Sequence, residues 1–178
     1  MAFNPYSLEG KTVLVTGASS GIGKATAIAC SRLGAHVIVS GRNSERLQET
    51  FSELDGEGHL QIIAEVITSS IAGVCSVDIG NTLYSVSKSA VDGFMKNAAK
   101  ELAEKGIRVN SVNPGMVDTP INDYTSVSEE QKLADLTNYP LKRHGKPEEI
   151  AYAIIYLLSD AAAWVTGTAL KIDGGYSL

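Results

Sequence analysis

Short apolar runs and longer helical repeats alternate along the first third of the chain. Thr12–Thr16 is a run rich in β-branched residues, which predicts a buried strand. After a glycine-rich turn, apolar residues recur at helical spacing and predict a helix, at Ile22, Ala25, Ala29 and Leu33. Gly34 follows directly, and we expect it to end this helix as its C-cap.

The same order of strand and helix then repeats. His36–Ser40 predicts a second strand, and the turn after it offers Asn43 or Ser44 as the N-cap of a helix that runs toward Leu54. His59–Ala64 predicts a third strand after a glycine-containing loop. Strands that alternate with helices in this way are typical of a parallel α/β sheet.

The second half of the chain begins with a long predicted helix, from about Tyr84 to Lys105. Its expected apolar stripe has a residue at every fourth position, at Val86, Ala90, Phe94, Ala98 and Leu102. Ile107–Val112 and Ala169–Ile172 predict two further strands. Between them lie a polar flap over 116–146 around a short helix, and a helix that starts at Pro147.

One pair of apolar runs breaks this order. Val66–Ser70 has the character of a strand, yet it follows Ile62 and Ile63 with no helix between them. Parallel neighbours need a crossover connection of about a dozen residues or more. The two runs therefore cannot be separate parallel strands of one sheet, and the residues alone allow one long strand here.

Composition and charge exclude several classes of protein. The 178 residues suit a single domain, and 44% hydrophobic with 20% charged residues is ordinary for a soluble α/β protein. A net charge of -5 argues against a nucleic-acid or anionic-membrane partner, because both require a basic surface. No apolar run approaches the roughly 20 residues of a membrane span, and the N-terminus does not have the pattern of a secretory signal. The two cysteines fit reduced thiols, so we expect a cytoplasmic protein.

The turn after the first strand carries the chemistry of a dinucleotide site. Its spacing is Thr-Gly-x-x-x-Gly-Ile-Gly, between a strand and a helix. Glycines let the backbone approach a pyrophosphate, and the helix N-terminus presents free N–H groups to it. We therefore expect cofactor contacts from Gly17, Ser19, Ser20, Gly21, Ile22 and Gly23.

The end of the second strand indicates which nucleotide binds. Sites specific for NAD usually place an acidic residue there to hold the ribose 2′-hydroxyl, whereas this chain has Ser40 and Gly41. Arg42 follows and can pair with a 2′-phosphate. The sequence therefore favours NADP(H) over NAD(H), although a solvated turn charge would also explain Arg42.

A tyrosine and a lysine lie four residues apart at the start of the long helix. Tyr84 and Lys88 therefore share one helix face. A free tyrosine has a pKa near ~10, and a nearby positive charge favours the phenolate and lowers that pKa. Tyr84 could then exchange a proton with a carbonyl or alcohol oxygen while the Ser70 hydroxyl hydrogen-bonds the same oxygen. Such a pair alone is weak evidence, because most are a packed tyrosine beside a surface lysine.

Taken in order, these motifs resemble the short-chain dehydrogenase/reductase family. The glycine turn, Ser-Ser-Ile-Ala-Gly, Tyr-x-x-x-Lys and Asn113-Pro114-Gly115 follow one another as in that family, and the C-terminal part is similar to the 3-oxoacyl-(acyl carrier protein) reductase-like branch. The resemblance implies that Ser70, Tyr84 and Lys88 are catalytic and that Tyr84 and Lys88 also contact the cofactor. It further implies contacts to the nicotinamide end from Pro114, Gly115, Val117 and Thr119.

The resemblance also implies a fold, and one part of that fold is missing. We expect a Rossmann-type doubly wound parallel sheet with helices on both faces, forming a single NADP(H)-binding domain over 1–178. The family's Asn-Asn-Ala-Gly strand, with helices on either side of it, would lie between Ala64 and Val66 and is absent, so one central strand is lacking. Its loss would leave backbone groups of the first strand unpaired, at roughly 1–3 kcal/mol each.

Three hypotheses explain this gap. In the first, the complete protein contains a further segment here, which predicts an intact mass well above 18.8 kDa. Alternatively, the deletion is genuine and neighbouring strands close the gap, or a second chain completes the sheet.

The main hypothesis is an NADP(H)-dependent oxidoreductase that transfers a hydride between the nicotinamide and a carbonyl or alcohol substrate. The alternative is a non-catalytic nucleotide-binding or assembly remnant of the same family, inactive because the asparagine-bearing segment is absent. We expect a small-molecule substrate, no metal, and a homodimer or homotetramer. The three histidines lack partners at catalytic or metal-ligand spacing, which favours structural roles for them.

Overall fold

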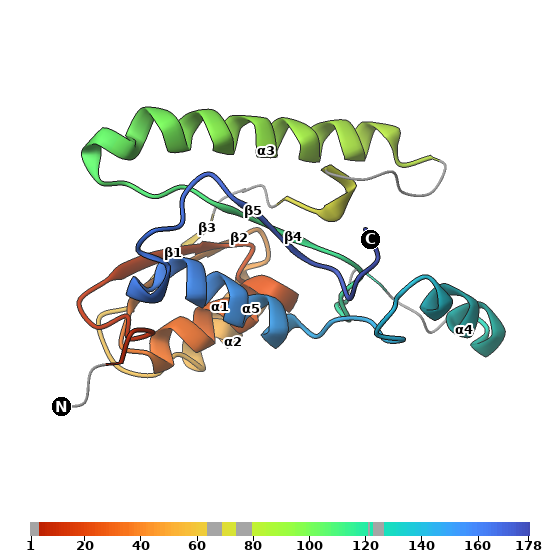
Figure 1. The fold of residues 1–178 in the computed structure, drawn as a ribbon. Coiled ribbons are helices and arrows are strands. Elements are labelled where there is room, and N and C mark those ends of the chain that lie inside the picture. Colours follow the sequence, from red (N-terminus) through yellow and green to blue (C-terminus); the bar gives the residue numbers. More distant parts are fainter. Residues whose placement is uncertain (1–3, 64–68, 74–79, 121, 123–126) are drawn as a thin grey trace. The chain divides into compact units, whose positions relative to one another are not determined.

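The computed structural model describes the chain except for residues 1–3, 64–68, 74–79, 121 and 123–126 (Figure 1). The chain forms two compact units. The first comprises 1–67, 118–121 and 146–163, and the second comprises 68–117, 122–145 and 164–178. Each unit combines parallel strands with helices, which makes the protein α/β.

The first unit is built on a three-stranded parallel sheet. Its strands are β1 (Thr12–Thr16), β2 (His36–Gly41) and β3 (Leu60–Ile63), in the order β1-β2-β3. Thr12 pairs with His36 and Ile38 with Leu60, so each strand advances in register with the next. The helices α1 (Gly21–Arg32) and α2 (Ser44–Ser52) are the crossovers that these parallel pairs require.

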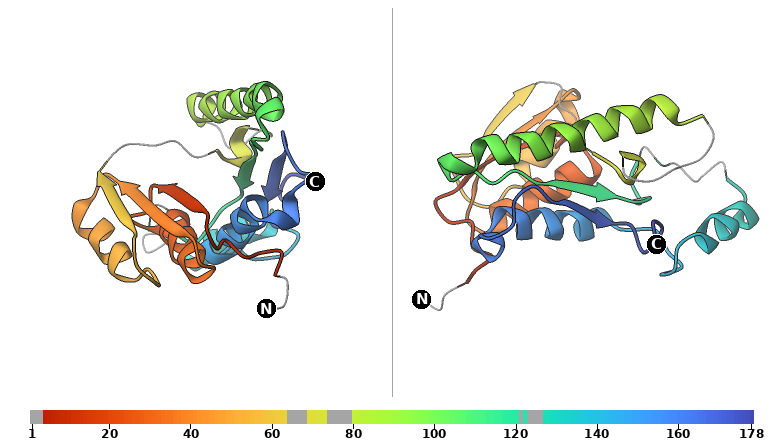
Figure 2. Two further views of the ribbon diagram at one scale, coloured as in Figure 1. Left: turned by 90° about the vertical axis from the view of Figure 1, so that its left-hand side faces the viewer. Right: turned by 45° about the horizontal axis from the view of Figure 1, so that its top comes forward.

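The core of the first unit lies between this sheet and its helices. Alternate residues of β1 and β2 are buried there, with α1 residues such as Ala27 and Cys30, and Ile155 of α5 (Pro147–Leu158). The helices α1 and α5 lie side by side (Figure 2). A short 3-10 helix, η3 (Asp160–Ala162), follows α5. Leu14 points to the opposite face of the sheet, where it is 59% exposed and where Thr12 and His36 are exposed as well.

The second unit contains a two-stranded parallel sheet and the longest helix. The strands β4 (Ser111–Pro114) and β5 (Ala169–Ile172) pair from Ser111 with Ala169 onward. The helix α3 (Thr82–Leu102) continues into the 3-10 helix η2 (Ala103–Lys105), which Gly106 ends in the left-handed conformation. A 3-10 turn, η1 (Ile71–Gly73), precedes α3, and α4 (Glu129–Thr137) forms the short helix of the flap.

Several predicted elements are confirmed to within a residue or two. β1 and β5 have the predicted bounds, and α3 begins two residues before the predicted Tyr84. Asn43 is the N-cap of α2, and its side chain accepts a hydrogen bond from the Arg46 backbone N–H.

The predicted apolar stripe of α3 is wrong over its first half. Val86 is 61% exposed and Phe94 is 73% exposed, while Asp92, Met95 and Ala98 are buried. Residues four apart advance by about 40° around a helix of 3.6 residues per turn. Residues at every fourth position therefore do not stay on one face of the helix. The buried residues are spaced by steps of three and four positions instead.

The strand predicted over Ile107–Val112 is shifted to Ser111–Pro114. Side chains replace the strand ladder in the preceding segment. Thr166 accepts from the Val109 backbone N–H through its hydroxyl, and the Asn110 side-chain amide donates to the Val165 carbonyl. Regular pairing with β5 therefore begins only at Ser111.

The strand predicted over Val66–Ser70 falls mostly outside the described residues. Its described part, Ser69 and Ser70, has no strand pairing and leads directly into η1. The described strands also form two separate sheets, not the single doubly wound sheet that was predicted, and β1 is an edge strand of its sheet. No strand in the described part of the chain pairs with β1 on the side away from β2.

Candidate functional site

The glycine turn of the first unit has the backbone conformation that only glycine adopts readily. Gly17 has φ of 66° and Gly21 has φ of 53°, both in the left-handed region. A Cβ on Gly23 would lie 2.3 Å from the Gly17 carbonyl oxygen. The three glycines therefore permit a turn that folds closely against the start of α1.

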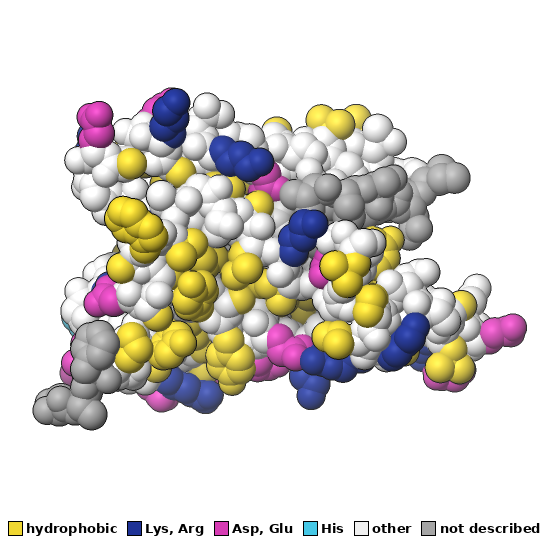
Figure 3. All heavy atoms as spheres, viewed as in Figure 1, with side chains coloured by type: hydrophobic (Ala, Val, Ile, Leu, Met, Phe, Trp, Pro, Cys, Tyr) yellow, Lys and Arg dark blue, Asp and Glu magenta, His cyan; other side chains and the backbone are white. Residues whose placement is uncertain are grey.

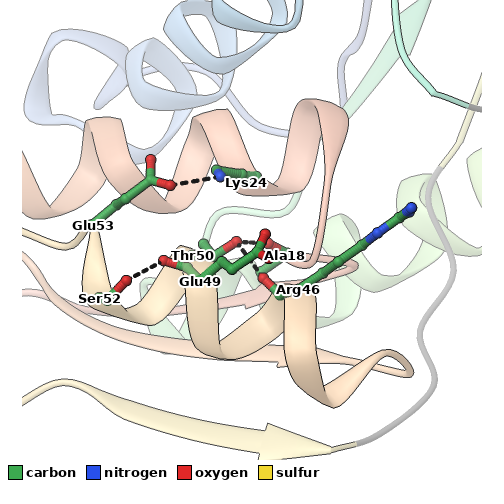
Figure 4. A network of polar contacts seen from close by, with 7 residues as sticks. All are labelled: Ala18, Lys24, Arg46, Glu49, Thr50, Ser52 and Glu53. Carbon is green, nitrogen blue, oxygen red and sulfur yellow. Dashed lines mark hydrogen bonds and ion pairs between the residues drawn. The ribbon is translucent and has the colours of Figure 1, made fainter.

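The glycine turn contacts α2 through a hydrogen bond (Figure 4). The Thr50 hydroxyl is buried and donates to the Ala18 carbonyl oxygen at 2.9 Å. It also lies 3.1 Å from the Arg46 carbonyl oxygen. Beside it, Lys24 of α1 forms an ion pair with Glu53 at 2.7 Å. These contacts fix Ala18, the second residue of the turn, against the helix that follows β2.

The N-terminus of α1 fits a bound phosphate. Ser20 is its N-cap, yet the Ser20 side chain does not cap the helix, and the first turn has no acidic residue. The backbone N–H groups of that turn are thus left for an anion. Ile22 lies in the same turn, and its carbonyl oxygen accepts from the Thr26 hydroxyl at 2.8 Å.

The end of β2 lies next to the glycine turn. The Ala18 backbone N–H donates to the Ser40 carbonyl oxygen at 2.9 Å, and a Cβ on Gly41 would meet the Ser19 hydroxyl at 3.2 Å. Arg42 follows, is exposed, and makes no ion pair or side-chain hydrogen bond with the described residues. The Ser40 hydroxyl is buried without a hydrogen-bond partner among them.

Thr119 belongs to the first unit and lies against the glycine turn. A Cβ on Gly21 would be 3.1 Å from the Thr119 methyl carbon. The structure therefore brings together the predicted cofactor residues of the turn, Arg42 and Thr119. The residues present fit a dinucleotide phosphate, because the turn is glycine-lined and no side chain caps the start of α1.

In the second unit, Tyr84 and Lys88 lie on one face of α3. The Lys88 ammonium nitrogen is 5.2 Å from the centroid of the Tyr84 ring, within cation–π range. Burial lowers the pKa of Lys88 below its usual 10.5, and the Asp92 carboxylate acts in the opposite direction. A cation is thus held beside the phenol, as the four-residue spacing predicts.

The turn that contains Ser70 packs closely on α3 beside Lys88. A Cβ on Gly73 would lie 2.7 Å from the Lys88 carbonyl carbon, so only glycine permits this approach. The Ser89 hydroxyl donates to the Gly73 carbonyl oxygen at 2.8 Å. Within the turn, the Ala72 backbone N–H donates to the Ser70 hydroxyl at 3.3 Å. Ser70 and Lys88 therefore belong to one packed substructure.

The remaining predicted cofactor residues follow β4. Pro114 ends that strand, and the Gly115 backbone N–H donates to the Ile172 carbonyl oxygen at 3.1 Å. A Cβ on Gly115 would lie 2.9 Å from the Cα of Asp173. Val117 is buried and forms a parallel bridge with Gly145. The predicted site residues thus fall in two groups, one in each compact unit.

Four residues that support these two groups had no predicted role: Thr50, Gly73, Asp92 and Asn113. Gly73 and Asn113 do lie within the motifs that carry the family resemblance. Asp92 had a detectable signal, because it follows Lys88 by four residues on the face of Tyr84. Thr50 and Gly73 act through contacts distant in sequence, which no local pattern reveals.

In the part of the chain that the structure describes, the charged surface, the potential metal ligands and the helix lengths do not indicate a second site. Figure 3 shows acidic and basic side chains interspersed on the viewed face. Within the described ranges, no three His, Cys, Asp or Glu residues cluster as metal ligands would, and no helix is long and apolar enough to span a membrane.

An α/β fold with a glycine-lined turn between a strand and a helix is typical of phosphate-binding and dinucleotide-binding proteins. The chain matches two family models: short chain dehydrogenase over residues 11–67, and Enoyl-(Acyl carrier protein) reductase over residues 63–177. The chain belongs to the short-chain dehydrogenase/reductase family of oxidoreductases. The two matches meet at residues 63–67.

Individual relatives agree with this assignment. A 3-oxoacyl-[acyl-carrier-protein] reductase, FabG of Thermotoga maritima, is 30% identical over 243 residues, which cover 94% of this chain and 98% of the relative. That span exceeds the 178 residues of this chain, so the relative contains residues with no counterpart here.

Solved structures show the same fold. A short-chain type dehydrogenase/reductase from Mycobacterium marinum matches with a TM-score of 0.82 and 27% identity over 97% of this chain and 98% of that one. The RhlG/NADP active-site complex of Pseudomonas aeruginosa matches with a TM-score of 0.89 and 24% identity over 99% of this chain and 100% of that one.

Proposed function

We propose that the protein is an NADP(H)-dependent oxidoreductase that interconverts a carbonyl compound and the corresponding alcohol. The single observation that carries the proposal is the pairing of Tyr84 with Lys88 on α3, where the ammonium lies 5.2 Å from the phenol ring. Family membership makes this pair meaningful, because on its own it would fit a structural contact.

Each residue has a distinct role in the proposed reaction. NADPH, when bound, supplies the hydride. Tyr84 donates a proton to the carbonyl oxygen of the substrate, and the Ser70 hydroxyl hydrogen-bonds the same oxygen. The Lys88 ammonium stabilises the negative charge that remains on the phenol oxygen, and it also binds ribose hydroxyls of the nicotinamide half. In the oxidative direction, Tyr84 accepts the proton.

The cofactor contacts follow from the two groups of residues. The turn from Gly17 to Gly23 binds the pyrophosphate through backbone N–H groups at the start of α1. Arg42 binds the 2′-phosphate, and no carboxylate at the end of β2 opposes that charge. This arrangement supports NADP(H) over NAD(H). A second set of contacts, to the nicotinamide end, comprises Pro114, Gly115, Val117 and Thr119.

The finer fold follows the same proposal. The two sheets are the parts of one Rossmann-type doubly wound sheet, in a single domain, that lacks a central strand and the helices beside it. The junction of the two family matches at 63–67 and the longer span of the relative support this position for the gap. Cytoplasmic location and a homodimer or homotetramer belong to the same proposal.

The gap favours a second candidate function. A chain without the asparagine-bearing segment would bind the nucleotide without turning over substrate, as a cofactor-binding or assembly remnant. Binding of NADPH without its oxidation by any of a panel of ketones and acyl thioesters would support this candidate.

The test of the main proposal is Tyr84→Phe. NADPH oxidation with a ketone panel should be lost, because the proton donor is gone, while the dissociation constant for NADPH should stay close to that of the wild type. Tyr152→Phe, which alters an exposed tyrosine on α5, is the matched control and should keep full activity. Turnover that persists in Tyr84→Phe would remove Tyr84 from its role.

A further inference from the structure

A buried carboxylate lies one helical turn beyond Lys88, on the same face of α3. Asp92 is 5% exposed, although it carries a group that normally requires water. A buried carboxylate is tolerated only where hydrogen-bond donors replace that water. The donors around Asp92 therefore indicate what this residue holds in place.

Three donors converge on Asp92. The Ser69 hydroxyl donates to Oδ1 at 3.0 Å, the Ser111 hydroxyl donates to Oδ1 at 2.8 Å, and the Asn113 amide donates to Oδ2 at 2.7 Å. Ser69 precedes η1, whereas Ser111 and Asn113 belong to β4. One side chain of α3 thus fastens both neighbouring segments to the helix.

Asn113 extends this network to the proposed catalytic serine. An amide NH2 group has two hydrogens. One bonds Asp92, and the other bonds the Ser70 carbonyl oxygen at 3.0 Å. Asn113 is fully buried, and a contact of 3.4 Å to the Ser69 hydroxyl is its weakest. The Asp92 carboxylate therefore orients the Asn113 amide so that the amide donates a hydrogen bond to the Ser70 backbone carbonyl.

We propose that Asp92 is a positioning residue: through Asn113 it fixes the Ser70 turn against the helix face of Tyr84 and Lys88. This inference rests on the proposed function, since it assigns Ser70 to that site. The acidic side chain also raises the pKa of Lys88, whose burial acts more strongly in the other direction. Asp92 therefore favours the charged ammonium as well as the placement of Ser70.

The test compares Asp92→Asn with two control variants. Ser111→Ala removes one donor to Asp92 and a 3.2 Å contact to the Asn113 side-chain oxygen, but leaves the bond from the Asn113 amide to the Ser70 carbonyl oxygen. Glu101→Gln changes an exposed carboxylate elsewhere on α3. Amide hydrogen exchange is followed at Ala72 and Gly73, whose N–H groups bond the Ser70 hydroxyl and carbonyl. Melting temperature, kcat for a ketone and KM for NADPH are measured alongside.

The positioning role predicts that Asp92→Asn speeds exchange at Ala72 and Gly73 and lowers kcat, each by about tenfold or more, with KM for NADPH little changed. Ser111→Ala should lower the melting temperature without either effect, and Glu101→Gln should change nothing. If kcat follows the melting temperature equally in Asp92→Asn and Ser111→Ala, Asp92 is merely structural. Unchanged exchange and kcat in Asp92→Asn would also overturn the proposal.

Two further outcomes remain decisive. If Asp92→Asn does not fold, Asn113→Ser takes its place, because it removes the donor to Ser70 and leaves two hydroxyl donors on Asp92; the same results are expected. If the wild-type protein oxidises no NADPH, the proposed function fails, while hydrogen exchange at Ala72 and Gly73 still decides the role of Asp92.

Discussion

The closest backbone approach in the glycine turn gives a prediction whose size follows from the structure. In Gly23→Ala, the new Cβ would lie 2.3 Å from the Gly17 carbonyl oxygen, 2.6 Å from the Gly17 carbonyl carbon and 3.0 Å from the Ala18 backbone nitrogen. All three are backbone atoms, so no side chain can rotate away. The turn would have to move by about 0.7 Å to reach even the shortest contact that Cβ atoms tolerate.

This overlap should lower both the free energy of unfolding and the affinity for NADPH. Overpacking of this kind costs about 1–3 kcal/mol. For a chain of this size, that loss lowers the melting temperature by about 2–12 °C. A displaced turn also no longer directs its N–H groups at a pyrophosphate, so NADPH affinity should fall by about tenfold or more.

Gly93→Ala is the matched control for this prediction. Gly93 lies within α3, is exposed, and has no atom within 4 Å of the position of a new Cβ. Alanine is the better helix former by about 0.5–1 kcal/mol, so this variant should be slightly more stable and bind NADPH normally. Thermal denaturation followed by circular dichroism and NADPH titration measure both effects. A Gly23→Ala protein as stable as the wild type, with normal NADPH affinity, would show that the turn accommodates a side chain at this position.

Three further predictions concern the supports of the two residue groups. Thr50→Val removes the hydroxyl that bonds the Ala18 carbonyl and should lower the free energy of unfolding by about 1–3 kcal/mol in urea titrations, whereas an unchanged value would show that this bond contributes nothing. Gly73→Ala places a Cβ 2.7 Å from the Lys88 carbonyl carbon and should reduce kcat; a normal kcat would contradict the packed arrangement. Burial raises the pKa of the Cys30 thiol from 9.0 to about 11. Between these two pH values the thiol therefore stays protonated in the native state, whereas it loses its proton in the unfolded chain. That stabilising contribution is complete below pH 9.0 and is lost toward pH 11, and the unfolding free energy should fall more steeply there in the wild type than in Cys30→Ala. Parallel pH profiles of the two proteins would argue against this assignment.

The elements of this protein follow from its sequence where local patterns decide them. Thr12–Thr16 is a strand because β-branched residues favour an extended backbone, and Pro147 begins α5 because its fixed φ suits a first helical turn. The turn from Gly17 to Gly23 is predictable for the same reason, since glycines at this spacing between a strand and a helix are typical of a phosphate-binding turn.

Contacts between distant segments account for what the sequence did not reveal. The buried face of α3 includes Asp92, which a search for apolar residues passes over, because its donors come from Ser69 and from β4. The shift of β4 to Ser111 depends on side chains near Val165 that replace a strand ladder. The need for glycine at Gly73 arises only when η1 meets Lys88.

In the proposed reaction, a hydride passes from NADPH to a carbonyl carbon and Tyr84 donates the proton. The most direct measurement uses NADPH that carries deuterium as its transferable hydrogen, with mass spectrometry of the alcohol product. We expect one deuterium on the carbinol carbon with the wild-type protein and no labelled product with Tyr84→Phe. NADPH bound by the wild-type protein with no deuterium in any product, or labelled product at the wild-type rate from Tyr84→Phe, would contradict this mechanism.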